Sequence, residues 1–394
     1  MKPIHKLKHI LLLLRWYDYR THRGVAQVAQ EAGWHLICPK GAEDSRRILQ
    51  GWQGDGCISV FDMPEPLEFF HSQNIPVVDL GLAELNIQLP RVATDNWEIG
   101  RLAAEHFLDR GYREVLALSH QGVPIFKERQ ASLRQHMQEK GGKVTILHGD
   151  LDHWSGLFQQ LEDVATERGQ RLEEMSVGFF AYEDCRAAEL ISLCLENGLR
   201  VPENVAVLGV DNDELINDGL AVGLSSIDTD LEGLGRVGAN LLRKLLEYPD
   251  SVDPDTIIRH PPKELVVRKS TDCYAVRSPL VAKALHWIHN NYHRGIQARD
   301  IAAALGVTQQ GLQKAFATSH IRSPAEDIRY QRSQAVRHYL CHTTDRLDDM
   351  AIACGFSSVD ALIRNFREFY KVTPGQYRKK QNQLRWSSLS GGCR

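Results

Sequence analysis

The chain has 394 residues, of which 43% are hydrophobic and 25% are charged, and its formal net charge at pH 7 is −3. This length exceeds what one ordinary hydrophobic core encloses, so the sequence predicts two or three domains. The composition is typical of a soluble globular protein and excludes a low-complexity chain. No apolar run approaches the length of a membrane span, and no signal-peptide cleavage site follows the short run of residues 10–14. We therefore expect a cytoplasmic protein with no membrane partner.

The charge is divided unevenly along the chain. From Pro279 onward 17 Lys and Arg stand against 8 Asp and Glu, whereas the preceding residues hold 30 basic and 42 acidic side chains. A basic C-terminal part on an acidic body favours contact with phosphates by that part alone. The alternative is that a small helical domain is basic by chance.

The eight cysteines include no Cys-x-x-Cys pair. This favours reduced, buried thiols over a disulfide framework or a zinc site. His286, His289 and His293 lie about one helical turn apart, but no acidic or thiol residue beside them completes a metal site. The sequence therefore predicts no metal and no cofactor.

The first hundred residues alternate between predicted strands and helices. The apolar run at residues 9–15 suits a strand buried on both faces of a parallel sheet. Further strands are predicted at 34–38, 56–61 and 76–80, and helices at 20–32, 44–50, 66–73 and 97–110. After Gly111 the pattern starts again, with strands at 115–119, 144–147, 177–181 and 205–210, and helices at 128–140, 157–168, 183–196 and 231–246. Two successive α/β sheets predict two lobes around a cleft within residues 1–270, followed by a linker at 271–279.

Ligands of parallel-sheet folds bind at the carboxyl ends of the strands. Polar and aromatic residues gather at these ends, and Arg129 begins a helix nearby. The candidate effector-binding residues are Trp16, Tyr17, Asp18, Asp62, Arg129, Asp184, Asp211 and Asn212. Carboxylates and amides can bind pairs of adjacent hydroxyls, and aromatic faces can cover the apolar side of a sugar ring. The alternative for each Asp is that it caps the helix that follows.

Two long strings in this region resemble the sugar-sensing domain of the LacI/GalR family. They are Arg91-Val-Ala-Thr-Asp-Asn-Trp-Glu-Ile-Gly-Arg-Leu-Ala-Ala-Glu-His-Phe107 and Val201-Pro-Glu-Asn-Val-Ala-Val-Leu-Gly-Val-Asp-Asn-Asp213. The resemblance implies the fold of periplasmic binding proteins, with two lobes that are joined by three crossovers and close on a sugar. It also implies a dimerising domain, and it places Arg129, Asp184 and Asp211 where that family contacts its effector.

The last hundred residues contain an internal repeat of one structural unit. Residues 300–316 and 349–366 each read as a short helix, a tight turn at Gly306 or Gly355, and a second helix. Matching positions are offset by 49 residues before the turn and by 50 after it. This repeat predicts two helix-turn-helix units in an all-α domain.

The second helix of each unit is expected to read DNA. Leu312 and Phe316, like Leu362 and Phe366, are spaced to face the core. The opposite faces carry the candidate DNA-binding residues, which are Gln309, Gln310, Gln313 and Lys314 in the first unit and Val359, Asp360, Ile363 and Arg364 in the second. Glutamine suits the major-groove edge of adenine, and lysine suits guanine or a phosphate. We expect the first unit to supply most of the base contacts; the alternative is that these are solvated helix faces.

Residues 280–378 are similar to the DNA-binding domain of the AraC/XylS family, in which two helix-turn-helix units sit on a long connecting helix. The domain is placed at 280–380, with a flexible tail at 381–394. Ile321 and Lys371 stand where that family commonly has Gly after each recognition helix. Loss of Gly at a left-handed cap costs about 1 kcal/mol.

The pairing of the two families, with Arg268-Lys-Ser-Thr-Asp272 at the junction, has a functional implication. It implies a homodimeric transcription activator that binds double-stranded operator DNA, works with RNA polymerase and responds to D-xylose. Another pentose, a hexose or a sugar phosphate remains open as the effector.

An enzyme is the alternative from another class. Gly233-Leu-Gly235-Arg-Val-Gly238 satisfies the GxGxxG spacing, but it lies within a predicted helix instead of following a strand. The sequence contains no P-loop, no nucleophile elbow and no HExxH motif. We therefore expect a regulator and not an enzyme.

Overall fold

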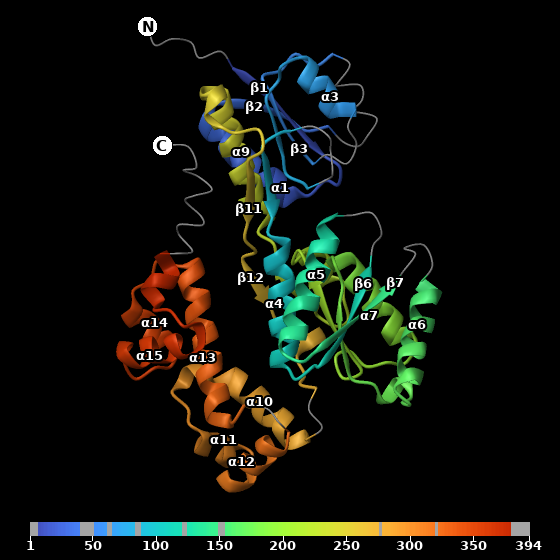
Figure 1. The fold of residues 1–394 in the computed structure, drawn as a ribbon, viewed down its shortest axis with the longest axis vertical. Coiled ribbons are helices and arrows are strands. Elements are labelled where there is room, and N and C mark those ends of the chain that lie inside the picture. The colour runs from blue at the N-terminus through green and yellow to red at the C-terminus, as the bar shows by residue number, and fades with distance from the viewer. Residues whose placement is uncertain are drawn as a thin grey trace.

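The structure, a computed structural model, describes residues 7–39, 51–60, 65–82, 88–119, 124–148, 154–275, 278–319 and 322–379. These residues form two α/β lobes stacked along the long axis of the molecule and a helical module beside the second lobe (Figure 1). The predicted fold class, a two-lobed α/β domain followed by an all-α domain with two helix-turn-helix units, is confirmed. The predicted helix at 44–50 and the tail at 381–394 lie outside the described residues.

The first lobe is built on a parallel sheet with the strand order β11-β5-β4-β3-β1-β2. Its strands are β1 Lys8–Leu14, β2 Trp34–Ile37, β3 Gly56–Val60, β4 Val77–Asp79, β5 Arg91–Thr94 and β11 Ile257–His260, and its helices are α1 Tyr19–Ala32, α3 Glu65–Ser72 and α9 Leu231–Glu247. Ile10 and Leu12 pack with residues of α1 and α9, whereas Leu11 and Leu13 pack with residues of α3. The apolar run of β1 is therefore buried on both faces, as predicted.

The second lobe has the strand order β12-β10-β9-β8-β6-β7, and only β12 runs antiparallel to its neighbour among the described strands. Its strands are β6 Glu114–Ser119, β7 Lys143–His148, β8 Val177–Phe180, β9 Val205–Val210, β10 Ser225–Asp228 and β12 Glu264–Val266, and its helices are α4 Asn96–Asp109, α5 Pro124–Glu139, α6 Trp154–Glu167, α7 Asp184–Glu196 and α8 Glu214–Asp218. Val115 and Ala117 face a core with residues of α4 and α5, and Leu116 and Leu118 face the core beneath α6 and α7. Helices thus cover both faces of this sheet as well.

The chain crosses between the lobes three times, between β5 and α4, between β10 and α9, and between β11 and β12. The three crossovers that the resemblance implies are confirmed. The strand–helix pattern alone placed α9 after the second sheet, whereas α9 and β11 return to the first lobe. They return because the apolar face of α9, which includes Leu234 and Leu242, completes the core over β1 and β3.

The GxGxxG string lies inside α9, where its glycines allow close helix packing. A Cβ at Gly235 would lie 2.3 Å from the carbonyl oxygen of Thr21 in α1. A Cβ at Gly24 would lie 2.0 Å from the carbonyl oxygen of Glu232 in α9. The spacing therefore serves the crossing of α1 and α9, because only hydrogen fits at these two positions.

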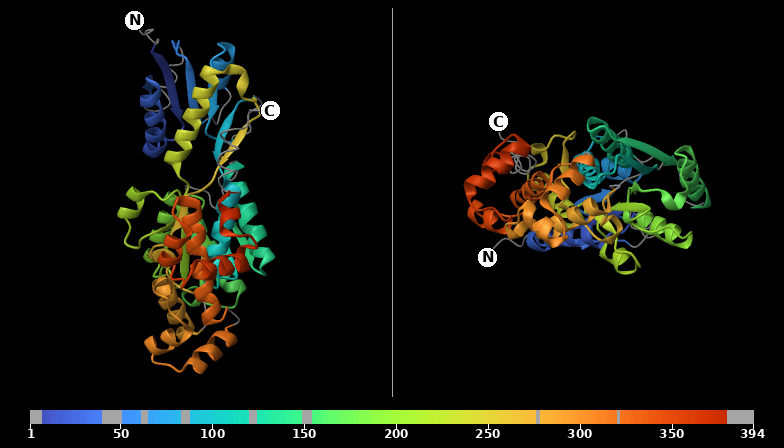
Figure 2. Two further views of the ribbon diagram at one scale, coloured as in Figure 1. Left: turned by 90° about the vertical axis from the view of Figure 1, so that its left-hand side faces the viewer. Right: turned by 90° about the horizontal axis from the view of Figure 1, so that it is seen from below.

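The helical module contains α10 Pro279–Asn291, α11 Ala298–Ala304, α12 Gln309–Thr318, α13 Pro324–His342, α14 Leu347–Ala353 and α15 Val359–Tyr370. Each helix-turn-helix unit has a hydrophobic core of its own, and the predicted core pairs of α12 and α15 are buried in them. Helix α13 contributes Ile328 to the first core, and Val336 and Leu340 to the second. The two views of Figure 2 place this module along the second lobe.

The junction between the two domains begins as a buried segment. Ser270 and Thr271 are fully buried against the second lobe, and the backbone N–H of Ala275 donates to the carbonyl of Arg110, 2.7 Å away. No helix within the described ranges is long and apolar enough to cross a membrane. In the same ranges no group of three or more His, Cys, Asp or Glu side chains could hold a metal ion, and His286 lies 3.4 Å from Asp272.

Candidate effector cleft and DNA-binding surface

An arginine of the first lobe reaches across to the second lobe at the strand ends. The guanidinium of Arg20, in the first turn of α1, donates to the carbonyl oxygens of Asp211 at 2.6 Å and Asn212 at 3.2 Å. These two residues follow β9. The structure thus brings the end of β1 and the end of β9 together across the cleft, although they are far apart in the sequence.

Asp18 is held at the start of α1 by two kinds of contact. Its carboxylate accepts from the backbone N–H groups of Arg20 and Thr21, and so caps the helix. The same carboxylate pairs with the Arg20 guanidinium at 2.7 Å. Burial works against ionisation, but these contacts with Arg20 outweigh it and lower the pKa of Asp18. The capping alternative therefore holds for Asp18, which also positions the arginine that spans the cleft.

Trp16 and Tyr17, at the end of β1, expose large aromatic faces. Their exposed fractions are 66% and 63%, which is unusual for side chains of this size. The Arg15 guanidinium lies 4.4 Å from the ring centre of Trp16, and the Tyr17 hydroxyl lies 3.1 Å from Nδ1 of His22. Both rings are accessible to the apolar face of a ligand.

Arg129, in α5, is buried among polar groups of the second lobe. Its Nε donates to Oδ1 of Asn96 at 2.8 Å, and its guanidinium also donates to the carbonyl of Tyr182. Burial lowers its pKa, whereas the carboxylates of Asp211, Glu183 and Asp184 oppose that shift. The positive charge of Arg129 is therefore balanced by acidic neighbours.

Asp184, at the start of α7, has hydrogen bonds on both carboxyl oxygens. Oδ1 accepts from the hydroxyl of Ser226 at 2.6 Å, and Oδ2 accepts from the backbone N–H of Asp213 at 2.7 Å. Burial and the nearby Asp211 raise the pKa of Asp184 to about 7. These bonds tie the loop after β9 to β10, and Gly209 leaves room for the carboxyl, since a Cβ there would lie 2.2 Å from Oδ1.

Asp211 and Asn212 form a turn in left-handed backbone conformations, with φ of 102° and 48°. The Asp211 carboxylate accepts from the Thr229 hydroxyl at 3.0 Å. Burial raises the pKa of Asp211, while Arg129 and Arg20 oppose the shift. A non-glycine residue in such a conformation stores roughly 1–3 kcal/mol of strain, and strain of this kind is common at ligand sites.

The side chain of Asn212 points to residues behind the turn. It accepts from the guanidinium of Arg268 at 2.8 Å and donates to Asp228 at 3.2 Å. Arg20 and Arg268 were not among the predicted site residues. Both arginines bind residues far along the chain, so no local pattern identifies either of them. Asp62 lies outside the described residues.

The candidate DNA-binding residues of the first unit lie on one accessible surface. Gln309, Gln310, Gln313 and Lys314 are all exposed on α12. In the second unit Asp360 and Arg364 are exposed, whereas Val359 and Ile363 are half-buried against the core of that unit. The first face is therefore the broader polar surface.

The turns of the two units have the geometry that their glycines predict. Gly306 and Gly355 have φ of 66° and 76°. Thr308 and Ser358 cap the recognition helices through backbone N–H groups at 3.1 Å and 3.2 Å. Lys371 adopts a left-handed φ of 60° at the end of α15, which is the conformation that favours Gly. Ile321 is not among the described residues.

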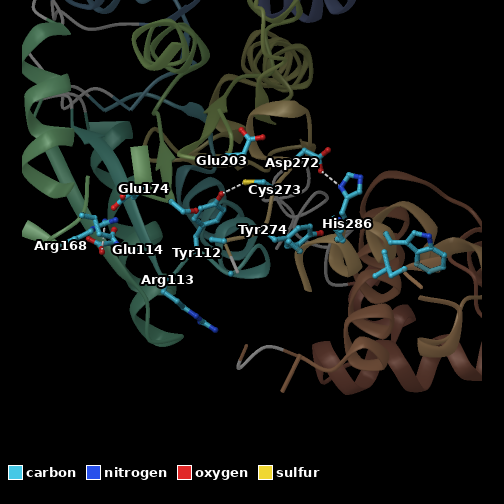
Figure 3. A pocket seen from close by; sticks show the side chains of 18 residues that line it. Tyr112, Arg113, Glu114, Arg168, Glu174, Glu203, Asp272, Cys273, Tyr274 and His286 are labelled. Carbon is cyan, nitrogen blue, oxygen red and sulfur yellow. Dashed lines mark hydrogen bonds and ion pairs between the residues drawn. The ribbon is translucent and has the colours of Figure 1, made fainter. Parts of the chain in front are cut away.

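A cavity of 1160 Å³ lies at the junction of the second lobe and the module, away from the strand ends. Figure 3 shows Tyr112 of the lobe, Asp272 and Cys273 of the connecting segment and His286 of the module around it. Arg129 and the described carboxylates predicted to bind the effector converge instead at the strand ends.

Two family models match the chain. Residues 104–271 match a periplasmic binding protein-like domain, and residues 301–380 match a helix-turn-helix domain. The chain is 26% identical to the xylose operon regulatory protein of Escherichia coli K12 over 96% of this chain and 98% of that protein. It is 24% identical to the protein of the same name from Haemophilus influenzae, over 92% of this chain and 95% of that one.

A solved structure of a xylose-binding transcription activator, xylR, aligns with 95% of this chain and 99% of its own, with a TM-score of 0.58 and 25% identity. The alignments therefore span both domains in the same order. They support a regulator and not an enzyme. The chain is a transcription regulator that joins a periplasmic-binding-protein-like domain to an AraC-type helix-turn-helix domain, and it is similar along nearly its whole length to the xylose operon regulatory proteins.

Proposed function

We propose that this chain is a cytoplasmic regulator that binds D-xylose in the cleft and activates genes of xylose uptake and catabolism. The observation that carries the proposal is the contact of Arg20 with the Asp211–Asn212 turn, because it brings polar groups of both lobes together at the strand ends. The xylose operon regulatory proteins, which this chain resembles over both domains, indicate the sugar.

The charges of the cleft favour a neutral polyhydroxy ligand over a sugar phosphate. Arg20 is paired with Asp18, and Arg129 lies among three carboxylates. No arginine of this set is left as an uncompensated cation for a phosphate, while carboxylate and carbonyl oxygens remain suited to hydroxyl donors. The exposed rings of Trp16 and Tyr17 provide an apolar surface for a sugar ring.

The proposed mechanism is a shift between lobe arrangements. A sugar that contacts residues of both lobes stabilises the closed form, and it changes operator affinity only through its preference for that form. In a homodimer, the closed form would set the spacing of two DNA modules on adjacent operator sites and present them to RNA polymerase. Lys314 and the glutamines of α12 would supply phosphate and base contacts.

Calorimetry of the full chain against a panel of sugars tests the proposal. The panel contains D-xylose, L-arabinose, D-ribose, D-glucose and a pentose phosphate. We expect saturable binding of D-xylose, and Asp211→Ala should weaken it by at least about tenfold, the effect of losing roughly 1.4 kcal/mol. Asp250→Ala, an exposed site in the first lobe, is the matched control.

Two results would count against this function. Binding of the phosphate or of a hexose in preference to D-xylose would change the effector. Turnover of D-xylose with ATP or NAD at enzymatic rates would contradict a regulator altogether.

A further inference from the structure

The DNA module is docked on the second lobe through a partly buried polar contact, which joins Asp109 of α4 to Tyr330 of α13 and to Arg322 just before α13. The hydroxyl of Tyr330 donates to Asp109 at 2.5 Å, and the guanidinium of Arg322 donates to the same carboxylate at 3.1 Å. Arg322 also lies 3.7 Å from the ring centre of Tyr330. Burial raises the pKa of Asp109, but Arg322 and Tyr330 oppose this shift. The carboxylate of the lobe therefore has two donors from the module.

Further polar contacts cross the same boundary. Arg337 of α13 lies 3.3 Å from Glu105 of α4, and His338 lies 3.6 Å from Glu264 of β12. Because α13 contributes to the cores of both helix-turn-helix units, a contact that orients α13 orients both recognition helices. Figures 1 and 2 show α13 alongside α4.

The opposite end of α4 lies at the cleft. Asn96, its first residue, is 1% exposed and accepts from Nε of Arg129. Helices α4 and α5 cross so closely that a Cβ at Gly100 would lie 2.3 Å from the carbonyl oxygen of Arg129. The hydroxyl of Ser132 also donates to the carbonyl of Trp97 at 2.6 Å. Helix α4 is therefore tied to the helix that carries Arg129.

A second chain of hydrogen bonds joins the cleft to the last turn of α4. It begins with Arg268, which donates to Asn212 in the turn after β9. The hydroxyl of Ser225 donates to the carbonyl of Arg268 at 2.9 Å, and the hydroxyl of Thr271 donates to Ser225 at 2.7 Å. His106 of α4 completes the chain, with its Nε2 2.8 Å from the hydroxyl of Thr271.

The neighbours of His106 determine which of its ring nitrogens carries the proton. A guanidinium can only donate, so Nδ1 of His106, which lies 3.1 Å from Arg110, is an acceptor. Nε2 therefore carries the proton and donates to Thr271. Burial, and then the charges of Arg110 and His289, lower the pKa of His106 well below its usual range, so the ring stays neutral. The donor and the acceptor of each hydrogen bond from Asn212 to His106 are thus defined.

We propose that α4 couples the cleft to the DNA module, with the Asp109–Tyr330–Arg322 contact as the surface that transmits the change. The module then moves with the second lobe as one body and does not swing on a flexible tether. The coupling role rests on the proposed function, whereas the docking surface itself does not.

The test uses the full chain and three variants. Asp109→Lys places a cation opposite Arg322 and breaks the contact, and Tyr330→Phe removes one hydrogen bond and keeps the ring. Tyr248→Phe changes an exposed tyrosine of the first lobe and is the control. Operator affinity is measured with and without D-xylose on a fluorescent duplex that the full chain has selected from a random pool.

Coupling between two sites usually changes affinity about 5- to 150-fold. The ratio of operator affinities with and without D-xylose should be the same in the wild-type chain and in Tyr248→Phe. Asp109→Lys should lower this ratio to about 1, and Tyr330→Phe should give a value between the two. D-xylose affinity in the absence of DNA should stay within about twofold of wild type, because the cleft residues are unchanged. A wild-type ratio in Asp109→Lys would overturn the coupling role.

A ligand-free measurement separates this inference from the proposed function. If D-xylose does not bind the wild-type chain, the effector proposal fails, and hydrogen exchange still tests the docking. Asp109→Lys should then speed amide hydrogen exchange in α13 and in α5, the two helices that α4 connects. The amides of α12 should exchange as slowly as in the wild type. Exchange rates equal to wild type in α13 and α5 would overturn the docking itself.

Discussion

The two helix-turn-helix units share one plan but sit in different surroundings. Both have a left-handed Gly at the turn, a hydroxyl cap on the recognition helix and a separate core. They differ in the polar face they expose, in how closely other segments approach the turn, and in the residue that ends the second helix. The two copies therefore share their packing pattern, while the surroundings and surface residues of each copy determine its stability and its polar face.

When the same substitution is made in both units, the largest difference in its cost is expected at the turns. A Cβ at Gly355 would lie 2.7 Å from the carbonyl oxygens of Tyr292 and His293, whereas nothing lies within 4 Å of one at Gly306. Gly306→Ala should cost about 1 kcal/mol, from the left-handed backbone alone. Gly355→Ala adds overpacking and should cost roughly 3 kcal/mol. Urea denaturation followed by circular dichroism measures both, and equal losses would mean that the turns are equivalent.

DNA binding should distinguish the two recognition faces next. Gln313→Ala removes a side chain suited to an adenine edge and should cost roughly 2 kcal/mol on the selected duplex. Asp360→Ala removes a negative charge near phosphates, so it should leave affinity unchanged or raise it. Fluorescence anisotropy on selected and scrambled duplexes measures the effect. A larger loss for Asp360→Ala would reverse the proposed division of labour.

Each unit also lies beside a buried polar side chain, which is Asp327 in the first unit and Asn365 in the second. Only the carboxyl of Asp327 can titrate. Burial raises the pKa of Asp327 in α13 to about 7, with Arg322 and Arg110 opposing and Asp109 adding to the shift. Between about pH 4 and 7 the folded chain then holds a proton that the unfolded chain has lost. The free energy of unfolding should therefore fall with rising pH in this window, by at most roughly 1.4 kcal/mol per pH unit.

Asp327→Asn should remove this contribution, because an amide does not titrate. The stability difference between variant and wild type should grow from pH 4 to 7 and stay constant above. Thermal unfolding at several pH values measures it, and the comparison at each pH cancels other titrating groups such as Asp184. A difference that does not vary with pH would show that Asp327 is ionised throughout. In the second unit the buried polar group is Asn365, whose amide has no hydrogen-bond partner among the described residues and does not titrate.

The smallest effect is expected at the helix ends. Lys371 closes α15 with φ of 60°, whereas Ser319 closes α12 with φ of −84°. Lys371→Gly should stabilise the chain by about 0.5–1 kcal/mol, because glycine adopts the left-handed region without strain. Ser319→Gly is the matched control and should not stabilise. A stabilising effect at both positions would rule out the left-handed cap as the cause.

Local patterns predicted much of the fold. The apolar run of β1, the glycine turns of the two units and the core pairs of α12 and α15 depend on near neighbours and on periodicity, and the structure confirms them. The return of α9 to the first lobe depends instead on which of two sheets its apolar face completes. No pattern within the helix decides that.

The site residues likewise divide into those that local patterns identify and those that depend on long-range packing. The strand ends identified Asp18, Asp184 and Asp211, which lie near the contact between the two lobes, and their roles in binding remain predictions. Arg20 contacts a turn 191 positions along the chain, and Tyr330 contacts α4 across 221 positions. Pairings at such separations arise only when the lobes and the domains pack, so neither residue stands out in the sequence.

The separate cores of the two units have a consequence for how new DNA specificities can arise. Because each recognition helix packs on its own set of apolar residues, substitutions on one reading face need no compensating change in the other core. The base pairs contacted by one unit can therefore change and be matched by that unit alone, while the other unit of the module keeps its own contacts. A chain built in this way can acquire new target promoters through single substitutions without losing its register on DNA.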